Sequence, residues 1–172
     1  ANNHNHYIII LKGKNKLNVK RLYKFNFSKN PFVFLIEFFK LIKLFRKLKP
    51  DIAMSWLYHS DLLLLIIGKI VSFPKEKLVW NTRCSFMDLN DYSVITRFIL
   101  FLLTKFSNHI GHIVFNSYEG RRYHKSIGYN NKNMIVIPNG FNLNKLKKNI
   151  LKKKYIKKKY NIGKNKVVGM FA

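Results

Sequence analysis

Acidic residues are the scarcest functional group in this chain. Its 172 residues include seven Asp and Glu against 33 Lys and Arg, a formal net charge of +26 at pH 7. No two of these carboxylates can be placed as a general acid and base. The histidine groups His4–His6 and His109–His112 have no carboxylate or cysteine at metal-ligand spacing. We therefore expect no catalytic pair and no metal or other cofactor in this chain.

Cysteine, long apolar runs and phosphate-binding loops are also scarce or missing. The one cysteine, Cys84, allows no internal disulfide, so we expect an intracellular protein in which this thiol is inert. The longest apolar runs, Leu62–Ile67 and Phe98–Leu103, fall well short of the ~20 residues that a spanning helix needs. The polar N-terminus does not resemble a secretory signal. No Gly-rich loop with Lys-Ser/Thr is present, which excludes a P-loop hydrolase.

The residues that are abundant indicate a folded and strongly basic domain. A hydrophobic fraction of 48%, with 15% aromatic residues, excludes a disordered chain. The cationic excess favours phosphate-rich partners, namely nucleic acid, anionic lipid headgroups or sugar nucleotides. An alternative remains open: Lys, Asn and Ile are over-used together, as nucleotide bias at tolerant positions would produce.

Short β-rich runs alternate with helical stretches along the chain. Predicted strands cover Tyr7–Leu11, Val19–Phe27, Asp51–Trp56, Lys77–Thr82, His112–Asn116, Met134–Ile137 and Val167–Ala172. Predicted helices cover Pro31–Leu48, His59–Val71, Ser93 to about Ser107, Ser117 to Gly128 and the basic stretch Leu146–Tyr160. This alternation predicts βαβ units and a doubly wound, Rossmann-like α/β sheet with parallel strands.

The helix Pro31–Leu48 carries the clearest amphipathic pattern. Its predicted buried side comprises Leu35, Phe38, Phe39, Ile42, Phe45 and Leu48, and its predicted exposed side comprises Glu37, Lys40, Lys43 and Lys47. The two ends of the chain differ from those of complete folds of this class. The last run, VVGMFA, resembles the interior of a buried strand, and the chain begins without a Gly-rich strand–loop–helix unit. We therefore expect a chain that is truncated at both ends.

Ligands of open parallel sheets lie beyond the carboxyl ends of the strands. The loops there supply the candidate binding residues Tyr58, His59, Arg83, Ser85, Ser117, Glu119, Asn139 and Gly140. One permanent cation, one imidazole and several small polar groups suit a phosphorylated or polyhydroxyl ligand. Structural roles remain open as well: Arg83 can pair with Asp88 or Asp91, and His59 and Ser117 can cap helices.

Four strings of the sequence resemble glycosyltransferase family 4. They are KPDIAMSWLYHSDLL (49–63), VWNTRCS (79–85), VIPNGFN (136–142), and YNIG (160–163) followed by VVGM (167–170), all in the family's order. The resemblance implies a GT-B enzyme with two Rossmann-like lobes and an active site between them. It places an incomplete acceptor-side lobe at residues 1–160, and the linker and first strand of the donor-binding lobe at 161–172.

The same resemblance implies a function. The parent enzyme would move a sugar from a nucleotide-sugar donor to a lipid-linked or polysaccharide acceptor in cell-surface glycan (polysaccharide or lipopolysaccharide) biosynthesis, with retention of configuration and no metal. Tyr58, His59, Arg83 and Ser85 would line the acceptor pocket, and Asn139 and Gly140 would shape the cleft near the hinge. The catalytic groups would lie in the missing lobe, so this chain alone is expected to be inactive. Hydrophobic helices and the cationic surface would hold the enzyme peripherally at the cytoplasmic face of the cell membrane.

Two residues depart from the family pattern. Arg83 stands where many relatives have a histidine, and Asn142 replaces the usual Asp.

Two other functions remain possible. A nucleic-acid-binding module would explain the charge, although the lysines are scattered and no binding motif is present. A non-catalytic membrane-surface protein would use the basic helix Leu146–Tyr160 as its anchor.

Overall fold

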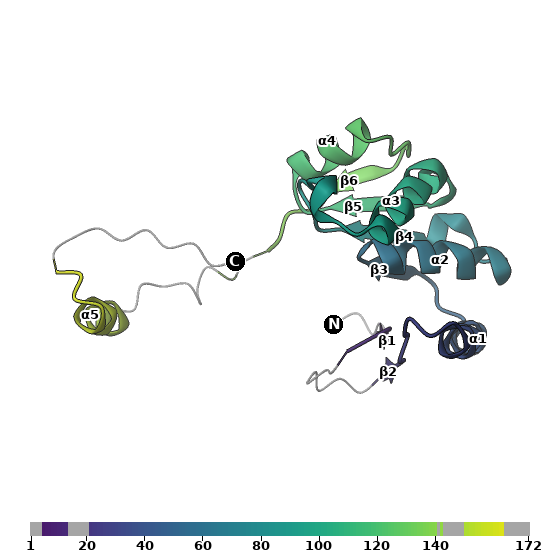
Figure 1. Cartoon of the computed structure of the whole chain (residues 1–172), viewed down its shortest axis with the longest axis horizontal. Coiled ribbons are helices and arrows are strands. Elements are labelled where there is room, and N and C mark those ends of the chain that lie inside the picture. Colours follow the sequence, from purple (N-terminus) through teal and green to yellow (C-terminus); the bar gives the residue numbers. More distant parts are fainter. Residues whose placement is uncertain (1–4, 14–20, 141, 143–149, 164–172) are drawn as a thin grey trace. The chain divides into compact units, whose positions relative to one another are not determined.

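Among the residues that the structure describes, six short strands and four of five α-helices form the first of two units (Figure 1). The computed structural model describes residues 5–13, 21–140, 142 and 150–163, and the units divide between Pro138 and Asn139. The strands are β1 (Ile8–Ile10), β2 (Leu22–Lys24), β3 (Ala53–Trp56), β4 (Leu78–Thr82), β5 (His112–Phe115) and β6 (Met134–Val136). The helices are α1 (Pro31–Leu48), α2 (Tyr58–Ile70), α3 (Val94–Phe106), α4 (Tyr118–Ser126) and α5 (Ile150–Lys159). Short 3₁₀ turns are η1 (Lys75–Lys77), η2 (Leu89–Asp91) and η3 (Ser107–His109).

All the strand pairs are parallel. Strands β3, β4, β5 and β6 form one sheet in that order, and β1 pairs with β2 in a second sheet. Each connection within the four-stranded sheet includes one helix, as parallel neighbours require. The predicted α/β fold with a parallel sheet is confirmed.

The main core lies between the four-stranded sheet and helices α2, α3 and α4. Trp80 and Phe115 are fully buried in it, together with Leu103 of α3. Residues of β3 and β6 that point to the opposite face, such as Met54 and Ile135, are exposed. A second core packs α1 and α2 against the segment around β1 and β2, with Phe45 of α1 near its centre.

Helix α1 has the predicted bounds but not the predicted buried side. Asn30 Oδ1 accepts the backbone N–H groups of Phe32 and Val33, and Pro31 occupies the first turn. Correcting the prediction, Leu35 and Phe39 are exposed, and Leu41 joins Ile42 and Phe45 in the core.

Glu37, predicted on the exposed side, is buried. Its carboxylate accepts the N–H of Asn26 at 3.0 Å and pairs with Lys40 at 2.9 Å. The Asn26 N–H and Lys40 supply the hydrogen bonds that a buried carboxylate needs, so Glu37 can lie on the buried side of the helix.

The caps of two later helices also follow the sequence. Ser93 Oγ accepts the N–H of Thr96 at the start of α3, and Ser117 Oγ accepts the N–H of Gly120 at the start of α4. Gly128, which follows α4, has φ +111°, a conformation that glycine adopts readily.

The second unit contains α5, the described part of the predicted helix Leu146–Tyr160. Lys157 Nζ donates to the carbonyl of Gly163, where φ is +59°. The predicted strand Val167–Ala172 lies outside the described residues, and the domain boundary after Tyr160 stays a prediction. In the described ranges no helix combines the length and apolarity that a membrane span needs.

Candidate functional site

The carboxyl ends of β3, β4 and β5 meet at one edge of the sheet, which we call the carboxyl edge. The parallel register places Trp56 beside Asn81 and Thr82 beside Phe115. The loops and helix starts that follow these strands carry six of the predicted ligand residues: Tyr58, His59, Arg83, Ser85, Ser117 and Glu119. The other two, Asn139 and Gly140, are exposed residues of the second unit.

The turn from β3 into α2 contains a strained residue and is held by two hydrogen bonds. Leu57 has φ +76°, a region that non-glycine residues rarely occupy. On either side of it, Ser55 Oγ donates to Asp61 Oδ1 at 2.5 Å. Trp80 Nε1 donates to the Asp61 carbonyl at 2.9 Å, which ties the turn to β4. These two hydrogen bonds fix the position of the exposed His59 at the start of α2.

Tyr58 is held by a buried histidine of α4. Its hydroxyl lies 2.8 Å from His124 Nε2, and His124 Nδ1 lies 2.7 Å from the Gly120 carbonyl. A carbonyl only accepts, so Nδ1 carries the proton and the Tyr58 hydroxyl donates to Nε2. Burial lowers the pKa of His124, which favours this neutral form. Tyr58 therefore links the start of α2 to the last turn of α4.

A second link joins the loop after β4 to the cap of α4. Ser85 Oγ and Ser117 Oγ are 3.0 Å apart. Gly120 makes this approach possible, because a Cβ there would lie 3.0 Å from the Cys84 carbonyl and 3.2 Å from Ser117 Oγ. The structure thus brings Ser85 and Ser117, predicted separately, into one cluster.

Glu119 places a carboxylate at the start of α4. Its own backbone N–H and the guanidinium of Arg122, 2.6 Å away, lower its pKa. An ionised carboxylate accepts hydrogen bonds and repels phosphate. The α4 end of the carboxyl edge therefore suits hydroxyl groups, whereas the exposed Arg83 supplies a cation beside it.

Three buried oxygens at the strand ends make no hydrogen bond in the described part of the chain. They are Asn81 Oδ1 and Thr82 Oγ1 of β4 and Asn116 Oδ1, which follows β5. Buried polar atoms without partners are uncommon in folded proteins. These three lie just beneath the loops that carry Arg83 and Ser117, so the carboxyl edge retains unused hydrogen-bonding capacity.

Sequence reasoning missed the polar residues beneath this edge. Asp61 is fully buried, and burial raises its pKa to about 7, with the Ser55 hydroxyl acting in the opposite direction. An aspartate at the head of the apolar run Leu62–Ile67 was the available signal. His124 had no comparable signal, because its partner Tyr58 lies 66 positions away.

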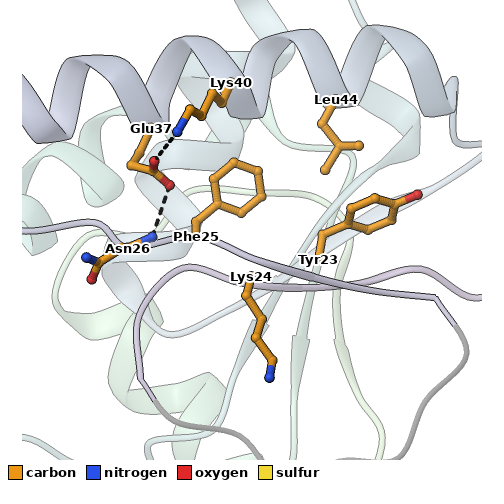
Figure 2. Close-up of a pocket in the computed structure, with 7 residues that line it drawn as sticks. All are labelled: Tyr23, Lys24, Phe25, Asn26, Glu37, Lys40 and Leu44. Atoms are coloured by element: carbon orange, nitrogen blue, oxygen red, sulfur yellow. Dashed lines mark hydrogen bonds and ion pairs between the residues drawn. The ribbon is translucent and has the colours of Figure 1, made fainter.

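A separate groove of about 440 Å³ lies between α1 and the segment that includes β2 (Figure 2). Tyr23, Phe25 and Leu44 supply its apolar lining, and Lys24, Asn26, Glu37 and Lys40 supply its polar lining. Both carboxylate oxygens of Glu37 are already hydrogen-bonded, to Lys40 and to the Asn26 N–H. We therefore assign Glu37 a structural role.

A metal site was not expected, and the described ranges contain no cluster of three His, Cys, Asp or Glu that could form one. Metal independence stays a prediction.

Comparison with solved structures shows the fold. The chain is similar to the crystal structure of Anabaena Alr3699/HepE in complex with UDP, at 15% identity and a TM-score of 0.63. It is also similar to the structure of that protein with UDP and glucose, at 14% identity and a TM-score of 0.61. Each match covers 84% of this chain and 38% of the Anabaena chain. A search of curated proteins gave no match.

The family assignment follows from a sequence match. The model of Glycosyltransferase Family 4 matches residues 1–145. This range is most of the chain and includes every strand of the four-stranded sheet. The resemblance stated from the four sequence strings is confirmed. The chain belongs to glycosyltransferase family 4.

Proposed function

We propose that this chain forms acceptor-side structure of a retaining, metal-independent glycosyltransferase. The parent enzyme would transfer a sugar from a nucleotide-sugar donor to a lipid-linked or polysaccharide acceptor during cell-surface glycan synthesis. The observation that carries the proposal is the family match over residues 1–145. The chain spans 38% of the similar Anabaena structures, so the activity is proposed for the whole parent protein.

The printed descriptions of the similar structures support the choice of donor. One contains UDP and the other contains UDP and glucose. We extend this chemistry to the present chain and propose a nucleoside diphosphate sugar as donor. The catalytic groups and most donor contacts would belong to the part of the enzyme that this chain does not include.

The carboxyl edge supports an acceptor-binding role. Ser85 and Ser117 offer two neighbouring hydroxyls, and Glu119 offers a carboxylate in the first turn of α4. Such groups hydrogen-bond sugar hydroxyls, which both donate and accept. Arg83 would contact an acceptor phosphate, because guanidinium binds phosphate through paired hydrogen bonds. His59 would lie on the other side of the acceptor, at the start of α2.

We further propose that the enzyme works at the cytoplasmic face of the cell membrane as a peripheral protein. A lipid-linked acceptor is confined to the bilayer surface, so a cationic enzyme surface would raise its encounter rate with such a substrate. The net charge of +26 supports this location.

A titration of the isotope-labelled 172-residue chain with a water-soluble prenyl diphosphate sugar tests the acceptor site. We expect the amide signals of Ser85, Ser117 and Glu119 to shift, and Arg83→Ala to weaken binding about tenfold, as loss of a charge-assisted pair would. Lys132→Ala is the matched control, because Lys132 is an exposed cation on another loop. Equal weakening by both variants, or shifts confined to other surfaces, would contradict the acceptor site.

The activity itself is tested on the parent protein, with labelled UDP-sugars and the same acceptor analogue in the presence of EDTA. We expect transfer with retained anomeric configuration, read by NMR of the product. Inversion of configuration would contradict the retaining mechanism, and loss of activity that Mg²⁺ restores would contradict metal independence.

A further inference from the structure

We propose that the outer surface of helices α1, α2 and α3 docks on an anionic lipid bilayer. This surface consists of the side chains of the three helices that face away from the two cores. The inference rests on the proposed function only for its biological reason, an acceptor held in a membrane. Binding to lipid requires neither donor nor acceptor and can therefore be tested separately.

Helix α1 contributes an apolar stripe that faces solvent. Phe32, Leu35, Ile36 and Phe39 are 50 to 76% exposed and recur at the spacing of one helix face. The opposite face is buried in the second core through Leu41, Ile42 and Phe45. Apolar residues thus occur on both sides of α1, although only one side packs against protein in the described structure.

Helix α3 repeats this arrangement. Val94, Ile95, Phe98 and Phe101 are 54 to 71% exposed, whereas Ile99, Leu100 and Leu103 are buried in the main core. Helix α2 packs against α3 and shares the second core with α1. It adds Ile66 and Ile70, which are 40 and 45% exposed. Exposed apolar residues gathered on one face of a helix in this way are typical of an interaction site.

The charges on this surface have one sign. Lys43, Arg46 and Lys47 follow the apolar stripe of α1, Lys69 lies on α2, and Arg97 and Lys105 lie on α3. The two acidic residues of the three helices, Glu37 and Asp61, are both buried. Throughout these fully described helices, the outer surface therefore presents cations and apolar groups without an exposed carboxylate.

An anionic bilayer is the partner that matches both features. Phenylalanine and aliphatic side chains enter the boundary between headgroups and acyl chains, and lysine and arginine pair with lipid phosphates. Nucleic acid would use the cations but gain little from protruding aliphatic side chains. On α1 the apolar half precedes the basic half along one exposed face, so both groups can contact lipid when the helix lies on the surface.

Sedimentation of the 172-residue chain with vesicles tests the proposal. We expect binding to phosphatidylcholine vesicles that contain phosphatidylglycerol and little binding to phosphatidylcholine alone. Because a basic chain adsorbs to any anionic surface, the decisive comparison is between variants of equal charge and exposure. Phe32→Ser with Phe39→Ser should weaken binding about tenfold, a loss of about 1.4 kcal/mol. The control pair Phe86→Ser and Tyr118→Ser removes aromatics of similar exposure (71 and 65%, against 76 and 64%) from the carboxyl edge and should change binding little.

A second pair of variants tests the charges. Lys43→Glu with Lys47→Glu should weaken binding more than Lys125→Glu with Lys132→Glu, although both pairs change the net charge equally.

If the α1 aromatic variant does not retain its circular dichroism spectrum, Phe98→Ser with Phe101→Ser replaces it. Equal effects of test and control pairs would overturn the proposal, because they would indicate adsorption by scattered charge. Self-association in solution that the Phe→Ser variants abolish would overturn it in favour of a second copy of the chain. Salt-sensitive RNA retention that depends on the same lysines but not on the aromatics would overturn it in favour of nucleic acid.

Discussion

Replacing Asp61 by asparagine should stabilise this protein, and the gain should grow with pH. Asp61 is fully buried, one of its carboxylate oxygens accepts the Ser55 hydroxyl, and the other, Oδ2, has no partner in the described structure. Burial raises its pKa to about 7. In the unfolded chain the pKa of an aspartate is about 3.9.

The sign follows from proton linkage. Between these two pKa values the unfolded chain has lost the proton and the folded chain retains it, so the free energy of unfolding falls as pH rises. A difference of about 3 pKa units at about 1.36 kcal/mol per unit gives a loss of about 4 kcal/mol by about pH 8, and about 1.5 kcal/mol by about pH 5. The asparagine side chain does not titrate, keeps an oxygen for Ser55, and places an uncharged NH₂ where Oδ2 lies. The variant should therefore escape this loss.

Urea unfolding of both proteins at several pH values, followed by circular dichroism, measures the difference. We expect the variant's advantage to increase from about 1.5 kcal/mol near pH 5 to about 4 kcal/mol near pH 8. Asp51→Asn, at an exposed position just before β3, controls for the removal of a carboxylate. Parallel pH profiles for Asp61→Asn and the native chain, or a less stable variant near pH 8, would refute the reasoning. Parallel profiles would show that folding does not change the pKa of Asp61, and a less stable variant would show that the folded protein stabilises the charged carboxylate.

Three further substitutions test other contacts. Gly111→Ala should destabilise the fold by about 1–3 kcal/mol in urea unfolding, because its Cβ would lie 2.5 Å from the Lys75 carbonyl; an unchanged midpoint would contradict this close approach. Tyr58→Phe leaves His124 Nε2 buried without a donor and should cost about 1–3 kcal/mol near pH 8, with a smaller effect disproving the hydrogen bond. Glu37→Gln should lower the thermal midpoint near neutral pH, because Lys40 first and the Asn26 N–H second lower the pKa of Glu37. The stabilisation by ionised Glu37 is present above the pKa of this residue in the unfolded chain and is lost as the pH falls through its pKa in the folded chain. The thermal midpoints of the native chain and the variant should therefore converge in acid, and a constant difference between them would contradict the prediction.

Local rules in the sequence determined where the elements begin and end. Asn30 and Pro31 start α1, and Pro50 follows the Lys49 cap at its end, all within a few residues. Ser93 and Ser117 likewise cap α3 and α4, and alternation of strands with helices was sufficient to predict a parallel sheet. These features depend on neighbours in the chain, so the sequence displays them directly.

The candidate site was predictable only in part. Placing ligand residues after strand ends predicted that His59, Arg83 and Ser85 lie at the carboxyl edge, as the structure has them, because the rule depends on topology alone. It did not show that Ser85 contacts Ser117 or that Tyr58 contacts His124, since these contacts join loops and helices far apart in the chain. The roles of the site residues stay predictions until ligand binding is measured.

The sequence by itself determined the family, the fold class and where α1, α3 and α4 begin, because those depend on local patterns and on strings kept in order. The predicted strand Val19–Phe27 was too long, since β2 ends at Lys24. Only the tertiary structure decided which side of α1 is buried and which polar groups the core encloses. The periodicity of α1 allows two buried faces, since apolar residues occur all around its first half. Glu37 selects one of them through the Asn26 N–H, and Asp61 and His124 become buried because Ser55, Tyr58 and Gly120 supply the hydrogen bonds that burial requires.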